Sequence, residues 1–151
     1  MDVADMIDAW KINNVICLEL LAACPNDSFE LKPGKGKTIR SNFVHLIGVS
    51  KMWLEDKLKP FAETIPKLDW KSAAREELID GLNITSHGMI QVFEKMAPGK
   101  SNLICYFAYC IAHEAHHRSQ VEISLRIAGI GPDDSFFFDL WNWSKKDISG
   151  Q

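Results

Sequence analysis

The chain has 151 residues, of which 46% are hydrophobic and 25% are charged, and its formal net charge is −3. These values are typical of a single globular domain, here residues 1–151, with room for a sizeable core. They exclude the basic surface by which proteins bind nucleic acid. The sequence has no run of 18 apolar residues, and its first residues lack the pattern of a signal peptide. We therefore expect a cytoplasmic protein with neither a nucleic-acid nor a membrane partner.

Four segments have the apolar periodicity of amphipathic helices, and glycine, proline and asparagine clusters separate them. Thr38 or Ser41 can cap the second segment, and Gly129 is a stop signal after the fourth. The pattern predicts an all-α fold, a four-helix bundle with long crossover connections and an aromatic C-terminal tail. We expect the tail, residues 136–143, to pack onto the bundle or onto a second subunit. The predicted helices cover residues 2–23, 38–58, 71–96 and 101–128.

Two histidines lie four residues apart in the fourth predicted helix. His113 and His117 would project from one helix face, with their Cβ atoms roughly 5–6 Å apart. His45 lies at the edge of the apolar side of the second helix, where it can complete a three-histidine face. Three neutral imidazoles with one open position are typical of a reactive metal site. We therefore predict that His45, His113 and His117 bind a divalent metal ion.

Several polar residues are candidates for supporting roles near these ligands. Glu114 projects about 100° from His113, within the apolar arc, where a carboxylate needs a partner. It could fix a ligand tautomer, handle protons, or pair with a basic side chain on another helix. Tyr106, only about 20° from His113 in projection, is a second candidate for proton transfer. Asp56 and Gln120 are candidate hydrogen-bond partners of the ligands.

Residues 113–117 also satisfy the H-E-x-x-H pattern of metalloproteases, in which the glutamate acts as general base. The extended form of that motif needs a third histidine six residues after the second, and this position is Ile123. The only later glutamate, Glu122, lies on the same helix at an unsuitable angle. We therefore do not favour a protease.

Two patches resemble the DinB-like, or YfiT-like, metal-binding helical bundles, which are distinct from the DNA polymerase of the same name. Asn42–Val49 is similar to the "HL.GV" region of that family, and His113–Gln120 is similar to its "H-x-x-H-H-R-G-Q" signature. Ser119 departs from the usual glycine. The resemblance implies that His45, His113 and His117 are the ligands, that the metal is zinc or nickel, and that the protein is a homodimer.

Some members of that family are S-transferases or isomerases that use a low-molecular-weight thiol. The resemblance therefore favours a metal-dependent thiol-transfer enzyme that acts on a small-molecule substrate. Two alternatives stay open. The metal could instead activate water in a small-molecule hydrolase. The protein could also be a non-catalytic, metal-stabilised dimer with a stress-response or binding role.

Overall fold

The computed structural model describes residues 2–96 and 101–151, which form helices and no strand. The predicted all-α class is therefore confirmed. Four helices are long, and they match the four predicted segments closely except at the start of the third. They are α1 (Val3–Ala23), α2 (Ile39–Lys57), α4 (Arg75–Lys95) and α5 (Ser101–Ala128). The described part of the chain contains no helix long and apolar enough to cross a membrane.

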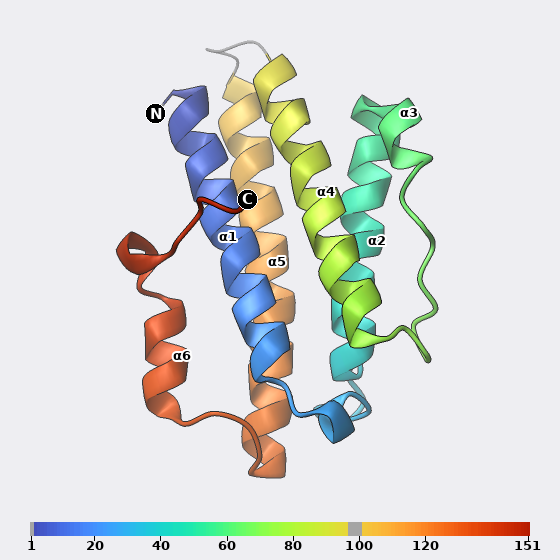
Figure 1. Cartoon of the computed structure of the whole chain (residues 1–151), viewed down its shortest axis with the longest axis vertical. Helices are drawn as coiled ribbons and strands as arrows, with labels where there is room; N and C mark the ends of the chain where they lie inside the picture. The colour runs from blue at the N-terminus through green and yellow to red at the C-terminus, as the bar shows by residue number, and fades with distance from the viewer. Residues whose placement is uncertain (1, 97–100) are drawn as a thin grey trace.

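The four long helices lie alongside one another (Figure 1). Helices α1 and α2 each contact both α4 and α5. Because α2 and α4 run in the same direction, the chain between them must return along the length of α2 (Figure 1). This connection begins with the short helix α3 (Lys59–Ala62) and continues through residues 63–74 without regular structure. It is a long crossover of the kind that the sequence predicts.

Local signals explain where the helices begin and end. The Thr38 hydroxyl accepts a hydrogen bond from the backbone N–H of Ser41 at 3.1 Å, so Thr38 is the N-cap of α2. At the end of α5, Gly129 has a φ of 66°, which favours glycine. The N–H of Ile130 then donates to the carbonyl of Leu125, as in a Schellman motif. These caps fix the ends of the two helices that carry the histidines.

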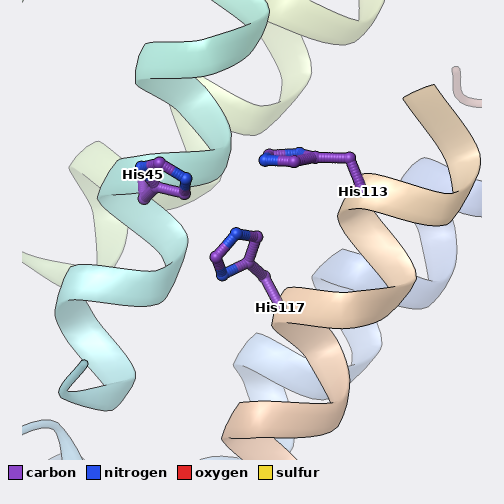
Figure 2. A group of neighbouring side chains, drawn as sticks. All are labelled: His45, His113 and His117. Atoms are coloured by element: carbon purple, nitrogen blue, oxygen red, sulfur yellow. The ribbon is translucent and has the colours of Figure 1, made fainter. Parts of the chain in front are cut away.

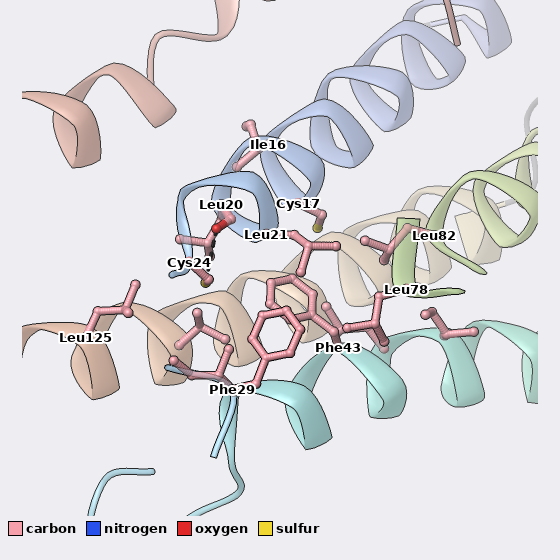
Figure 3. Close-up of a cluster of buried hydrophobic side chains, with 14 of the residues drawn as sticks. Ile16, Cys17, Leu20, Leu21, Cys24, Phe29, Phe43, Leu78, Leu82 and Leu125 are labelled. Atoms are coloured by element: carbon pink, nitrogen blue, oxygen red, sulfur yellow. Dashed lines mark hydrogen bonds between the residues drawn. The ribbon is translucent and has the colours of Figure 1, made fainter. Parts of the chain in front are cut away.

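Apolar side chains from all four long helices form the core (Figure 3). Phe43 on α2 and Leu78 on α4 are fully buried in one cluster, and Trp10 and Phe93 are buried in the other. Helices α2 and α4 approach closely at Gly81, where an added Cβ would lie 2.7 Å from a side-chain carbon of α2. The core therefore holds α2 at a fixed position beside α4 and α5.

The aromatic tail forms helix α6 (Asp134–Leu140) and a short 3-10 helix, η2 (Trp143–Lys145). Phe137 and Leu140 are buried against the rest of the chain, and α6 contacts α1. The expected packing onto the helices is therefore confirmed. Phe138 and Trp141 remain 80% and 64% exposed.

Candidate metal centre

His45 on α2 and His113 and His117 on α5 point toward one another across the gap between the two helices (Figure 2). The ring centroid of His45 lies 5.4 Å from that of His113 and 4.5 Å from that of His117. One ring nitrogen from each residue lies within 4.8 Å of the others. The helical spacing of His113 and His117 brings their rings to 4.8 Å between centroids. The structure thus brings together the three histidines that the sequence predicts as ligands.

Asn42 fixes the tautomer of His117. The Nδ2 group of Asn42 donates to the backbone carbonyl of Thr38 at 3.0 Å, which leaves the amide oxygen to face His117. That oxygen lies 2.9 Å from Nδ1 of His117 and can only accept, so Nδ1 carries the proton. The lone pair on Nε2 of His117 is then free for a metal ion. Such a partner on the other ring nitrogen is a regular feature of histidine ligands.

All three imidazoles are neutral at neutral pH. Burial is the main reason why the pKa of His117 falls from 6.5 to about 4, and the neighbouring histidines and Lys37 lower it further. Burial also lowers the pKa of His45 and of His113. Neutral imidazoles do not have to lose a proton before they bind a metal ion.

A divalent ion fits this donor set. With nitrogen-to-zinc distances of about 2.0–2.1 Å, tetrahedral ligands lie about 3.3 Å from one another, so the rings need to close by no more than about 1.5 Å. The Nδ1 atom of His113 is buried and has no hydrogen-bond partner among the described residues. Such an orphaned nitrogen is costly unless a further group satisfies it. Three nitrogen donors would leave a fourth tetrahedral position open.

Two aromatic residues, which the sequence analysis did not single out, form a wall of the site. Trp53 on α2 contacts His113 edge to face, with 5.5 Å between ring centroids. The ring of Tyr109 lies 6.1 Å from that of His113, and its side chain is 55% exposed. Tyr109 lies four residues before His113, so helical spacing alone could have identified it.

Glu114 belongs to a buried network between α5 and α1. Its Oε2 atom accepts a hydrogen bond from Asn13 at 2.5 Å and lies 3.7 Å from a guanidinium nitrogen of Arg118. Arg118 also donates to Oδ1 of Asn13 at 2.8 Å and to the sulfur of Cys17 at 3.1 Å. Of the roles considered for Glu114, the structure therefore shows pairing with a basic residue, but Arg118 lies on the same helix. None of the described contacts joins Glu114 to the histidines.

The other predicted supporting residues also lie away from the three ligands. Tyr106 packs against Trp53 and Phe93, and burial raises the pKa of its hydroxyl. Asp56 is exposed and forms an ion pair with Lys57. Gln120 lies 2.7 Å from Nε2 of His116, an exposed histidine.

The comparisons with known proteins do not add to this picture. No family model, curated protein or solved structure matches the chain.

Proposed function

We propose that His45, His113 and His117 bind one divalent metal ion, with zinc or nickel as the expected metal. The observation that carries this proposal is the convergence of three neutral ring nitrogens within 4.8 Å of one another. The hydrogen bond from His117 to Asn42 supports it, because it presents Nε2 of His117 as a donor. Imidazole nitrogen suits zinc, nickel, copper and iron, so the expected metal rests on the family resemblance.

We also propose that the chain is a DinB-like four-helix bundle. Two features support this interpretation. The four long helices contact one another in the cyclic order α1, α4, α2 and α5. The histidines of the two similar patches meet at one site.

We infer further that the protein is a metal-dependent thiol-transfer enzyme. An ion held by three imidazoles with an open position lowers the pKa of a thiol that binds there, and so supplies a nucleophile at neutral pH. The chain would contribute the three ligands, the orientation imposed by Asn42, and an aromatic wall formed by Trp53 and Tyr109. Glu114 is committed to its buried network, so the thiol proton would pass to solvent on the open side of the site.

The metal is tested first. The untagged protein should contain about one divalent ion per chain by mass spectrometry after incubation with zinc or nickel. His45→Ala and His117→Ala should lose the ion. His116→Ala is the matched control and should keep it, because that residue lies next to His117 but is exposed. Wild-type protein that folds but takes up no metal would contradict the proposal.

The reaction is tested with the metal-loaded protein. Low-molecular-weight thiols, including cysteine and glutathione, are offered with the electrophile 1-chloro-2,4-dinitrobenzene. We expect conjugation above the uncatalysed rate, and loss of this activity in His117→Ala. Hydrolysis of p-nitrophenyl acetate without added thiol would instead indicate a hydrolase. A metal-dependent rise in melting temperature without either activity would indicate a structural metal in a stress-response or binding protein.

We propose, finally, that two copies of the chain form a homodimer through α5. Exposed, mostly apolar residues recur every three or four positions along this helix, and Ile123 and Ile127 are 46% and 71% exposed. Such a stripe is typical of an interaction surface. Light scattering should give twice the chain mass for the wild type and the single chain mass for Ile123→Glu. A monomeric wild type would contradict this proposal.

A further inference from the structure

A pocket of about 550 Å³ adjoins His45 on the outer side of α2. One wall is the outward face of α2, and the other is the crossover at residues 66–70, which runs along α2 (Figure 1). Its volume is within the range of small-molecule sites. His45 is one of its lining residues, so a molecule in the pocket would lie beside a proposed metal ligand. The residues that matter for its chemistry are Lys37, His45, Gly48, Lys51, Lys67 and Trp70.

The charged residues that line the pocket are all basic. Lys37, Lys51 and Lys67 belong to its walls, and no aspartate or glutamate of the described ranges does. Across the described residues, none of these three ammonium groups has a carboxylate oxygen within 4.0 Å. The whole chain carries a net charge of −3, so this concentration of positive charge is local. Walls of one charge attract a ligand of the opposite charge.

Lys51 also holds the two walls together. Its ammonium group donates to the backbone carbonyl of Ala62 at 2.6 Å and to that of Ile65 at 2.7 Å. These bonds attach the crossover to α2 just before residues 66–70. The pocket therefore has a preformed wall, which lowers the entropy cost of binding a ligand.

Gly48 leaves space at the α2 wall of the pocket. Glycine inside a helix costs about 1 kcal/mol relative to alanine. At Gly81 and Gly88 this cost has a packing reason, because an added Cβ would lie 2.7 Å and 2.6 Å from neighbouring side-chain atoms. At Gly48 an added Cβ would meet nothing within 4 Å. Packing within the chain therefore does not explain Gly48, and the space beside this exposed position is open to an occupant of the pocket.

Trp70 gives the pocket an apolar surface. Trp70 is 56% exposed, and it lines the pocket from the crossover. The ammonium group of Lys71 lies 4.8 Å from its ring centroid. A large indole that remains this exposed at a pocket wall is available to a flat apolar group.

We propose that this pocket binds a small organic anion, with its negative group near Lys37 and Lys67 and its apolar part between Gly48 and Trp70. The anionic group can be a carboxylate or a phosphate, since lysine ammonium groups bind both as point charges. The role of this molecule as a substrate rests on the metal-dependent function proposed above, whereas its binding does not.

The test measures the binding of three related probes by calorimetry, with metal-free and metal-loaded protein. Phenylacetate and phenyl phosphate carry the two candidate anionic groups, and phenylacetamide is neutral. We expect one or both anions to bind at millimolar concentration, and the amide to bind about tenfold more weakly or worse. The stronger of the two anions identifies the group that the pocket prefers. No saturable binding of either anion, or equal binding of the amide, would overturn the inference.

Variants then locate the bound anion. Gly48→Leu should weaken binding about tenfold or more by filling the space at the α2 wall, while its melting temperature stays equal or rises. Lys67→Gln should weaken it about threefold, whereas Lys59→Gln, an exposed lysine outside the pocket, should have no effect. Unchanged binding in folded Gly48→Leu would overturn the inference.

Metal content is measured on the same samples. A bound metal without anion binding would refute only the pocket, and anion binding by a chain that takes up no metal would refute only the metal centre.

Discussion

Two Glu–Arg pairs on α5 have the same spacing and different environments. Glu114 and Arg118 are 5% and 7% exposed, whereas the side chains of Glu122 and Arg126 are 30% and 44% exposed. Both pairs are four residues apart on one helix. Replacement of each arginine by methionine, which keeps much of the apolar stem, therefore compares a buried pair with an exposed one, although Arg126 also pairs with Asp134 and lies over the ring of Phe137. The free energy of unfolding is the quantity to measure.

Arg118→Met should be strongly destabilising. It removes the cation beside a buried carboxylate and also takes a donor from Asn13 and from Cys17. Loss of one partner of a buried ion pair costs about 3–5 kcal/mol, because the other charge stays buried without compensation. Typical domains unfold with only about 5–15 kcal/mol, so this loss is a large fraction of the total. Arg126→Met should cost much less, because the ion pairs of Arg126 with Glu122 and Asp134 are exposed to solvent.

The loss of unfolding free energy in Arg118→Met should depend on pH in a direction that identifies Glu114 as the cause. Burial already raises the pKa of Glu114 above its ordinary value, and Arg118 opposes this shift. Without Arg118, the pKa of Glu114 in the folded protein should rise further above its value in the unfolded chain. A carboxyl group with a raised pKa in the folded state favours folding at low pH, and this contribution disappears as the pH rises through that pKa. The deficit of Arg118→Met relative to the wild type should therefore shrink as the pH falls from 7 to 5.

Urea denaturation followed by circular dichroism is the suitable assay, because urea does not screen charges as guanidinium does. Glu114→Gln/Arg118→Met removes both charges and should be more stable at pH 7 than Arg118→Met alone. A loss of less than about 1 kcal/mol in Arg118→Met would refute the reasoning, because it would place the pair among exposed ion pairs. A double variant less stable than the single one would refute it as well.

Three further predictions follow from the site and its helices. Without metal, stability should fall between pH 6.5 and pH 4 by about 1–2 kcal/mol, a figure discounted for solvent screening of the ring. The reason is that the unfolded chain takes up a proton that His117, with its pKa of about 4, does not. Urea titrations in a chelator check this, and a flat profile would contradict it. Asn42→Leu should lower zinc affinity about 10- to 100-fold in competition with a chromophoric chelator, and an unchanged affinity would show that Asn42 does not orient His117. Gly88→Ala should cost about 1–3 kcal/mol, because its Cβ would lie 2.6 Å from a carbon of Phe61. Gly48→Ala should gain up to about 1 kcal/mol, and thermal melts that reverse this order would contradict the packing argument.

Apolar periodicity predicts most of the fold. The predicted bounds agree with those of α1, α2 and α5 to within a residue or two, because capping and stop signals such as Thr38 and Gly129 mark their ends. The sequence predicts that the third helix begins at residue 71, but α4 begins at Arg75. The residue before it is Ala74, which has no capping side chain, and Glu77 instead reaches back to the N–H of Ala74. A helix that begins without a capping residue gives little signal in a single sequence.

The histidines and their supporting residues differ in how well spacing predicts them. His113 and His117 meet because one helix sets their separation, so the sequence suffices. Asn42 lies three residues before His45 on the same helix, and this spacing could have identified it. The partner of Glu114 depends on how α1 packs against α5, since Asn13 lies 101 positions away in the chain. Tyr106 shares the projected face of His113 but lies about two turns away, so its hydroxyl does not reach the histidines.

The buried network and the metal site lie on two faces of α5. The network can therefore influence how α5 presents His113 and His117 to His45. Glu114 and Arg118 are each one residue after a histidine ligand, so every rotation of α5 that moves the pair away from α1 also turns His113 and His117 away from His45. Hydrophobic packing is largely non-directional, whereas hydrogen bonds to Asn13 need a narrow geometry. The polar contacts with α1 therefore add a directional constraint on the rotation of α5 to the constraint that the close packing of its buried apolar residues supplies. Destabilising the pair should for this reason affect the histidines even though none of the described side-chain contacts joins them.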